Sequence, residues 1–327
     1  MRLSNKLSLR CLLMLAAVTA VPVALAAPLA APNGLEAGSP EHAVPGLAAP
    51  AQRQQRQGAL FKVTKSGQTS YLFGTIHVGA KSFYPLAPEV SEALAGASQL
   101  VLELDTGAAE AFRRAVIAHA SYPRGQHIAE HVSADTMARL TGALHAVGIT
   151  VGSVAHLRPW LLANHLMGLE LERSGFARSN GNEVFLLAQA QARGTAVAEL
   201  ESADYQLALF ATLNDADAER YLREALAGLS DGSSLHKARA TIDAWASGNH
   251  AALDALVPDA VKGTSVMADF TRRMLLGKRN PEMAARIETL MRGGKTTFVG
   301  VGLLHLLGAE GLPRLLSRRG FQVERVY

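Results

Sequence analysis

The sequence reads Tyr71-Leu-Phe-Gly-Thr-Ile-His-Val78 near its start and Thr297-Phe-Val-Gly-Val-Gly-Leu-Leu-His-Leu306 near its end. Each stretch is an apolar strand that runs into a Gly-x-x-His turn, which places His77 after the first strand and His305 after the second. Glycine allows the chain to bend sharply where a strand ends. A single histidine in such a turn is ordinarily only a turn residue, but the duplication predicts that the two histidines meet at one site.

The residues after each Gly-x-x-His turn repeat a second pattern. A helix over 87–97 and a strand over 99–105 are predicted after the first turn, and a helix over 309–319 and a strand over 321–327 after the second. Ligands of open α/β sheets collect at the carboxyl ends of the strands. We therefore predict an α/β fold of mixed α+β type, with a central sheet built from both ends of the chain.

The region between the two units, 108–292, is mostly helical in pattern. Apolar residues recur there at helical spacing after plausible N-caps, which are Ser133, Ser153, Ser202 and Asn214. One break, Thr195-Ala-Val-Ala-Glu-Leu-Glu201, predicts a short strand. Leu60–Thr64 and Tyr71–Ile76 flank a turn-forming segment and predict a hairpin. The sequence thus predicts a sheet domain that carries a large helical insertion.

The first 26 residues have the layout of a secretory signal peptide. A basic start and an apolar run lead to the small-x-small site Ala24-Leu-Ala26. The segment contains Cys11, the single cysteine, so we expect the mature chain to lack thiols and disulfides. Residues 27–57 are rich in Ala, Pro and Gly and predict a flexible linker, which leaves 58–327 as the folded domain. We expect a periplasmic or secreted protein with no membrane span after cleavage.

The charge balance argues against nucleic acid as a partner. Three of the 32 basic residues and none of the 28 acidic ones lie in the predicted signal peptide. Its removal leaves 29 basic against 28 acidic residues, a net charge of +1. A balance so close to neutral does not predict binding to nucleic acid or to an anionic membrane surface.

Three residues are placed where ligands of a metal belong. His77 and His305 follow strand ends, and Glu103 lies near the end of the strand predicted after the first unit. Two imidazoles and one carboxylate are a common ligand set for a catalytic divalent metal that keeps open positions. Such an ion acidifies water and polarises a carbonyl. A general base would come from a remaining carboxylate, and the candidates are Asp105, Glu183 and Glu201.

A second histidine motif competes with this site. His127-Ile-Ala-Glu-His131 matches the H-x-x-E-H signature of a zinc peptidase, which requires both histidines on one face of a helix. Pro123 and Gly125 precede the segment, and the predicted cap Ser133 follows it. We therefore expect a loop or a strand here, and no metal site.

A charged segment, Lys278-Arg-Asn-Pro281, precedes a predicted helix. Asn280 as the cap and Pro281 as the first helical residue would be an ordinary helix start. Arg279 has two interpretations: it orients a carboxylate or a substrate carbonyl through bidentate hydrogen bonds, or it is simply solvated.

Taken together, these segments resemble the TraB/GumN family over roughly residues 58–327. The resemblance depends on the order of several short motifs, which are Leu72-Phe-Gly-Thr-Ile-His77, Leu102-Glu-Leu-Asp105, Arg158-Pro-Trp160, Leu200-Glu-Ser202, Arg279-Asn280 and Val299-Gly-Val-Gly-Leu-Leu-His-Leu-Leu-Gly308 with Gly311-Leu312 and Gly320-Phe-Gln-Val323. Together and in this order the motifs are specific, although no single one is.

The resemblance implies a fold shared with erythromycin esterases and a haem-binding lipoprotein, and a relation to the Tiki proteases that inactivate Wnt. Tiki proteins are described as manganese- or cobalt-dependent peptidases, which carries a ligand role over to His77, Glu103 and His305. One position departs from the family pattern. Relatives usually show Gly-hydrophobic-Asp where this chain has Gly181-Asn-Glu183, which leaves the role of the longer carboxylate open.

The leading hypothesis is an exported metal-dependent hydrolase acting on a peptide or a small ester, most simply a peptidase. His77, Glu103 and His305 would hold manganese, cobalt or zinc, and Arg279 would shape the site. Two alternatives use the same residues. One is an esterase-like hydrolase in which a histidine is the base without a metal, and the other is a non-catalytic protein that binds haem or iron.

Overall fold

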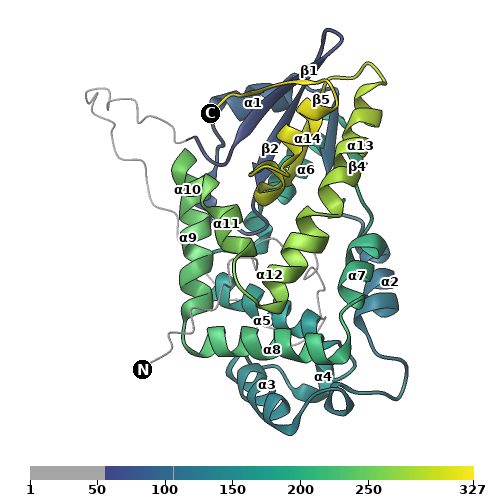
Figure 1. The fold of residues 1–327 in the computed structure, drawn as a ribbon, viewed down its shortest axis with the longest axis vertical. Helices are drawn as coiled ribbons and strands as arrows, with labels where there is room; N and C mark the ends of the chain where they lie inside the picture. Colours follow the sequence, from purple (N-terminus) through teal and green to yellow (C-terminus); the bar gives the residue numbers. More distant parts are fainter. Residues whose placement is uncertain (1–55, 106) are drawn as a thin grey trace, which may run out of the picture.

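The computed structural model describes residues 56–105 and 107–327, so the predicted signal peptide and the linker up to residue 55 lie outside the described residues. A six-stranded sheet, in the order β4-β3-β5-β2-β1-β6, occupies one end of the molecule, and helices extend from it (Figure 1). The mixed α/β fold predicted from the sequence is confirmed.

Four neighbouring strands of the sheet are parallel. They are β4 (Ala196–Glu199), β3 (Gln99–Leu102), β5 (Thr297–Gly302) and β2 (Gln68–Thr75). The two Gly-x-x-His strands, β2 and β5, are direct neighbours, with Thr75 opposite Gly302. Because these strands are parallel, their carboxyl ends share one edge of the sheet. The strand predicted over 99–105 is shorter than expected and ends at Leu102, so Glu103 lies just beyond it.

Two antiparallel strands complete the sheet. β1 (Leu60–Lys65) forms the predicted hairpin with β2, and β6 (Gln322–Arg325) pairs with the other side of β1. Both central residues of the hairpin turn, Ser66 and Gly67, have positive φ angles (51° and 80°). Such two-residue turns match the right-handed twist of the flanking strands. The last strand of the chain therefore closes one edge of the sheet beside the first.

Helices fill the predicted insertion between β3 and β5, interrupted only by β4 among the described residues. They are α2 (Ala109–Ala115), a π-helix (Val116–Ala120), α3 (Ala134–Ala146), α4 (Val151–Val154), α5 (Pro159–Arg173), α6 (Asn182–Arg193), α7 (Ala203–Ala211), α8 (Asp215–Ser230), α9 (Ser233–Ser247), α10 (His250–Asp254), α11 (Leu256–Val261), α12 (Val266–Phe270), a second π-helix (Thr271–Leu276) and α13 (Arg279–Met291). The units at the two ends of the chain contribute α1 (Pro88–Ala95) and α14 (Leu312–Arg318). None of the helices within the described ranges is long and apolar enough to cross a membrane.

Three of the four predicted N-caps are confirmed. Ser133, Ser202 and Asn214 each accept a hydrogen bond from a backbone N–H in the first turn of the following helix. The fourth was wrong: Ser153 lies inside the short helix α4, whose cap is Thr150. Ser153 instead donates to the Thr150 carbonyl at 2.7 Å, a local side-chain bond that competes with capping.

A tryptophan connects the helical insertion to the end of β2. The Trp245 indole N–H, on α9, donates to the Gly74 carbonyl at 2.8 Å, and the Trp245 carbonyl accepts from Gly58 N–H at 2.7 Å. The Trp245 ring also packs edge-on against Phe73, with ring centroids 6.5 Å apart. α9 thus fixes the strand that carries the first Gly-x-x-His turn.

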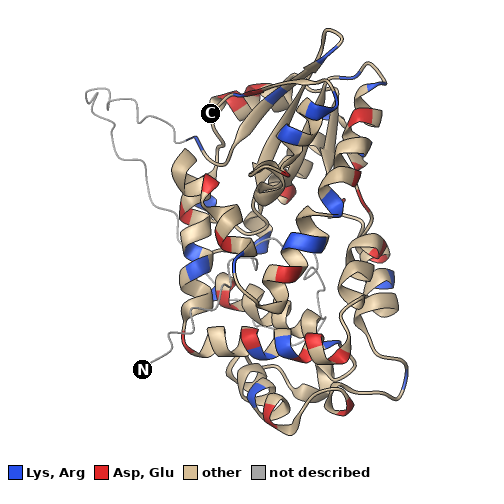
Figure 2. Cartoon of the chain, in the orientation of Figure 1, with Lys and Arg blue, Asp and Glu red and all other residues tan. Residues whose placement is uncertain are grey.

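Acidic and basic residues are interspersed along the elements (Figure 2).

Candidate functional site

The site is assembled at the shared carboxyl edge of the four parallel strands. Each strand delivers one side chain within three residues of its end: His77 after β2, Glu103 after β3, Glu201 after β4 and His305 after β5. Parallel pairing puts these ends side by side, although the residues are far apart in the sequence. The structure thus brings together the three residues predicted as metal ligands.

Gly302 lies at the centre of this group. A Cβ atom built on Gly302 would be 3.2 Å from Oε1 of Glu103, 3.6 Å from Nε2 of His77 and 3.6 Å from Cδ2 of His305. Its φ of −49° is open to any residue, so the glycine serves close approach here and not a special backbone conformation. The absent side chain leaves a space that all three predicted ligands border.

His77 is held by a carboxylate from α6. Its Nδ1 lies 3.0 Å from Oε1 of Glu183, and the Thr75 hydroxyl donates to the same oxygen. Burial by itself lowers the pKa of His77, but the charge and hydrogen bond of Glu183 outweigh burial and raise the pKa to about 9. His77 in turn lowers the pKa of Glu183 against the effect of burial. The two residues therefore form a buried ion pair at neutral pH.

The segment Gly181-Asn-Glu183 packs directly on the His77 turn. The Ile76 N–H donates to Oδ1 of Asn182 at 2.8 Å, and the Asn182 N–H donates to the Ile76 carbonyl at 3.0 Å. A Cβ on Gly181 would come within 2.5 Å of the His77 carbonyl oxygen, so only glycine fits. These contacts hold the start of α6 beside the His77 turn. From there the Glu183 side chain reaches Nδ1 of His77.

His305 is held by an amide instead of a carboxylate. Its Nδ1 lies 2.5 Å from Oδ1 of Asn280, while Nδ2 of Asn280 donates to the Glu310 carbonyl at 2.7 Å. That second bond fixes the amide so that its oxygen faces the ring, and Nδ1 of His305 is then the protonated nitrogen. Burial lowers the pKa of His305 to about 3, so the ring is neutral and Nε2 carries a lone pair.

Asn280 does not cap α13 as predicted. The helix begins at Arg279, with Lys278 in the cap position, so Asn280 and Pro281 both lie in its first turn. The Asn280 side chain instead contacts His305.

Glu103 is buried and fully hydrogen-bonded. Oε1 accepts from Gly302 N–H at 2.6 Å and lies 3.7 Å from Nε2 of His305, and Oε2 accepts from Nη2 of Arg279 at 2.7 Å. Burial raises the pKa of Glu103, but Arg279 and the other partners outweigh it and hold the pKa well below its usual range. The carboxylate is therefore ionised throughout the physiological range.

Arg279 joins two carboxylates. Besides Glu103 it binds both oxygens of Glu201, with Nε 2.9 Å from Oε1 and Nη2 2.7 Å from Oε2. Gln206 Nε2 donates to Glu201 at 2.7 Å. The interpretation of Arg279 as a solvated residue is wrong, because it is 3% exposed. The carboxylate-orienting interpretation is the one the structure supports.

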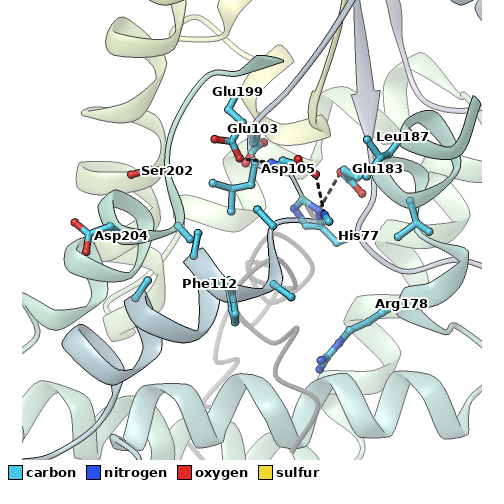
Figure 3. A pocket seen from close by; sticks show the side chains of 18 of the residues that line it. His77, Glu103, Asp105, Phe112, Arg178, Glu183, Leu187, Glu199, Ser202 and Asp204 are labelled. Atoms are coloured by element: carbon cyan, nitrogen blue, oxygen red, sulfur yellow. Dashed lines mark hydrogen bonds and ion pairs between the residues drawn. The ribbon is translucent and has the colours of Figure 1, made fainter. Parts of the chain in front are cut away.

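A cavity of about 850 Å³ opens onto two of the site residues, His77 and Glu103 (Figure 3). Asp105 and Glu183 also line it, whereas His305 and Arg279 do not. Of the three predicted base candidates, Glu183 is engaged by His77 and Glu201 by Arg279. Asp105 accepts a hydrogen bond from the Gly107 N–H at 2.8 Å and is the candidate that lines the cavity without an ion-pair partner among the described residues.

The competing His127–His131 segment is not a helical metal motif. Residues Ile128–Glu130 form a single 3₁₀ turn, as expected for a loop. Nδ1 of His131 pairs with Asp215 at 2.9 Å, and the ring stacks on Tyr122 with centroids 4.0 Å apart. His131 therefore has a structural role in packing the helical insertion.

The buried site carries surplus negative charge. Glu103, Glu183 and Glu201 face only two cations, Arg279 and the protonated His77, which leaves one net negative charge. As the side chains stand, no three His, Cys, Asp or Glu residues in the described ranges are grouped closely enough to hold a metal ion. Glu103 would have to turn from its present partners to join the two imidazoles.

The sequence alone does not identify the side chains that hold the site residues in place. Thr75 donates to Glu183, Asn182 accepts from the Ile76 N–H, Gln206 donates to Glu201, and Asn280, predicted as a cap, hydrogen-bonds His305. Thr75 and Asn280 lie within motifs that carried the family resemblance. That position in the sequence was the one signal that could have indicated them.

Comparison with known proteins identifies relatives of this chain. It is 24% identical over 256 residues to the uncharacterized protein YbaP of Shigella flexneri, a match covering 76% of this chain and 87% of that protein. YbaP of Escherichia coli (strain K12) is 24% identical over 255 residues, covering 75% and 87%. No solved structure matches. The model of the TraB/PrgY/gumN family matches residues 59–325, so the chain belongs to the TraB/PrgY/gumN family.

Proposed function

We propose that this protein is an exported metal-dependent hydrolase that cleaves peptide bonds. His77, Glu103 and His305 would hold a divalent ion, with manganese or cobalt as the first candidates and zinc as the third. Export follows from the signal peptide predicted over residues 1–26. The observation that carries the proposal is the convergence of two oriented imidazoles and a carboxylate around Gly302.

The orientation of the imidazoles suits metal binding. Histidines that bind metals through one nitrogen almost always donate the other N–H to a carboxylate or carbonyl, which fixes the tautomer. Glu183 does this for His77 and Asn280 for His305. In the neutral ring of each, Nε2 is then the nitrogen that can bind an ion. The donor set and the surplus negative charge of the site both fit a divalent cation.

A bound divalent ion would supply Lewis acidity toward a scissile carbonyl and would acidify water. The residues of the chain would do the rest. Arg279 keeps Glu103 ionised and aligned, and Glu201 keeps Arg279 in place. Asp105, on the cavity wall and without an ion-pair partner among the described residues, would be the carboxylate that accepts a proton from water.

The metal-free alternative is less well supported, because neither imidazole has a pKa near neutrality. His77 is protonated at neutral pH, with a pKa of about 9, and cannot accept a proton there. His305 has a pKa of about 3 and is a weak base. An efficient general base has a pKa close to the operating pH.

The haem alternative meets a steric obstacle. Nε2 of His305 faces Glu103 at 3.7 Å inside the protein, and His305 is only 1% exposed. An axial ligand of haem needs an open face on which the porphyrin can lie. His77 is the only one of the two imidazoles that lines the cavity.

The test is metal content of the mature protein by mass spectrometry after incubation with manganese, cobalt or zinc, followed by peptide cleavage assays. We expect about one equivalent of metal in the wild type and loss of it in both His77→Ala and His305→Ala. A matched control is His250→Ala, since His250 is an exposed residue at the start of α10. A wild type that takes up no metal at micromolar concentrations would exclude the metal-dependent hydrolase.

A further inference from the structure

We propose that the cavity beside His77 and Glu103 is a specificity groove that binds a peptide through a large apolar side chain. The groove lies between the segment of α2 with its following π-helix and the outer face of α6. The inference rests on the proposed function, since it names the substrate class for that site. Its volume, about 850 Å³, is within the range of roughly 300–1,000 Å³ usual for ligand sites.

One wall of the groove is built from small side chains. Phe112 is the only large apolar residue that α2 and its π-helix contribute to it; the other apolar residues of this wall are Ala108, Ala109, Ala111, Ala115 and Ala118. Methyl groups line a surface without filling the space in front of it. This wall therefore leaves room for a bulky group supplied by another molecule.

The opposite wall is the face of α6 that follows Glu183. Val184, Leu187 and Ala188 supply its apolar surface. Val184, on this wall, is 40% exposed. A large apolar side chain left exposed beside a cavity adds to the apolar surface that a ligand can cover.

The floor of the groove connects this apolar surface to the reactive groups. His77, Glu103 and Glu183 line the same cavity as the alanines of α2 (Figure 3). An apolar side chain seated between α2 and α6 would thus hold the neighbouring backbone carbonyl beside the proposed metal ligands. Binding energy from such a non-reacting group is what orients a substrate for reaction.

Charges on the lining favour a peptide over a lipid. Five carboxylates line the groove and disfavour a fatty-acid carboxylate or a phospholipid phosphate; they are Glu103, Asp105, Glu183, Glu199 and Asp204. The cations of the lining are fewer: His77, which pairs with Glu183, Arg114, which pairs with Glu110 at 3.5 Å, and Arg178. The lining also offers uncharged groups able to bind a peptide backbone, which are Ser179, Gln191 and Ser202.

The test uses two fluorescein-labelled peptides, acetyl-Gly-Ala-Phe-Ala-Gly and the same peptide with Ser in place of Phe. Binding to the mature protein is measured by anisotropy in EDTA, and cleavage is measured separately after addition of manganese. We expect the Phe peptide to bind at least about ten-fold more tightly than the Ser peptide. Ala188→Trp and Ala111→Trp, at exposed positions of the two walls, should each remove that difference. Ala192→Trp, one turn further along α6 and outside the groove, is the matched control.

Equal binding of the two peptides by the wild type, or an unchanged preference in both groove variants, would overturn the proposed groove. Displacement of the Phe peptide by laurate more strongly than by unlabelled peptide would overturn the peptide assignment in favour of a lipid. Failure of the proposed function is distinguishable from these results. Selective binding without cleavage in manganese would sustain the groove and count against the hydrolase. Cleavage of both peptides at equal rates would sustain the hydrolase and reject the groove.

Discussion

Oδ1 of Asn280 lies 2.5 Å from Nδ1 of His305, and the other end of the same amide donates to the Glu310 carbonyl. An amide fixed at both ends leaves one tautomer for the neutral imidazole, with its lone pair on Nε2. Asn280 is therefore the residue that sets the tautomer of His305, although it does not line the cavity.

Replacing Asn280 with alanine should weaken metal binding without removing a ligand. Loss of an outer-shell partner typically costs 10–100-fold in metal affinity, so we expect the dissociation constant of Asn280→Ala to rise by about that factor. Isothermal titration with manganese measures it. Asn249→Ala, at the exposed cap of α10, changes the same residue type away from the site and should leave the affinity unchanged. Wild-type affinity in Asn280→Ala would contradict the assigned role.

Arg279→Ala should destabilise the fold strongly. The substitution leaves two buried carboxylates, Glu103 and Glu201, without their cation. Breaking a buried ion pair by removing one partner costs about 3–5 kcal/mol. Urea denaturation of the metal-free protein would report the loss. Arg139→Ala removes an exposed pair with Asp135 on α3 and should cost less than about 1 kcal/mol. Similar losses in the two variants would show that Arg279 is not the counterion of a buried network.

The His77–Glu183 pair predicts a pH-dependent stability for the metal-free protein. The pKa of His77 is raised from 6.5 to about 9, so the folded state binds a proton more tightly than the unfolded state. The stabilisation is fully present below pH 6.5 and is lost as pH rises through 9. The stability advantage of wild type over Glu183→Gln should therefore be larger at pH 6 than at pH 10, by roughly 1–3 kcal/mol.

Chemical denaturation at the two pH values, with an NMR titration of the His77 ring, measures this effect. Asp204→Asn removes an exposed carboxylate beside His119 and should change stability by less than about 1 kcal/mol at both pH values. A difference between wild type and Glu183→Gln that does not shrink toward pH 10 would be evidence against the protonated His77.

Gly302→Ala should block metal uptake while the protein still folds. The added methyl would occupy the space bordered by Glu103, His77 and His305, and the backbone angle of Gly302 accepts alanine. We expect no metal by mass spectrometry and a stability within about 1–3 kcal/mol of wild type, the usual range for added core volume. Gly142→Ala, on α3 with open space around it, should bind metal normally. Normal uptake by Gly302→Ala would place the ion elsewhere.

The sequence was sufficient for the parts of the fold and site that local pattern encodes. The duplicated Gly-x-x-His turn predicted that His77 and His305 lie at one site, and the strands that precede them, β2 and β5, are neighbours paired in parallel. Caps such as Ser202 were predicted because capping is decided within one helical turn. The predicted start of α13 is two residues too late, and the bond between Asn280 and His305 joins segments 25 residues apart, which local pattern does not encode.

What the sequence determined by itself is which candidate site residues follow the ends of which strands. Periodicity and glycine placement act over a few residues, so they can be read along the chain. Only the tertiary structure decided the protonation state of those residues. Burial lowers the pKa of both rings, but the carboxylate of Glu183 outweighs burial and raises the pKa of His77, whereas burial prevails at His305, whose Nδ1 meets the neutral amide of Asn280. Those partners come from separate helices and are brought to the rings only by tertiary packing.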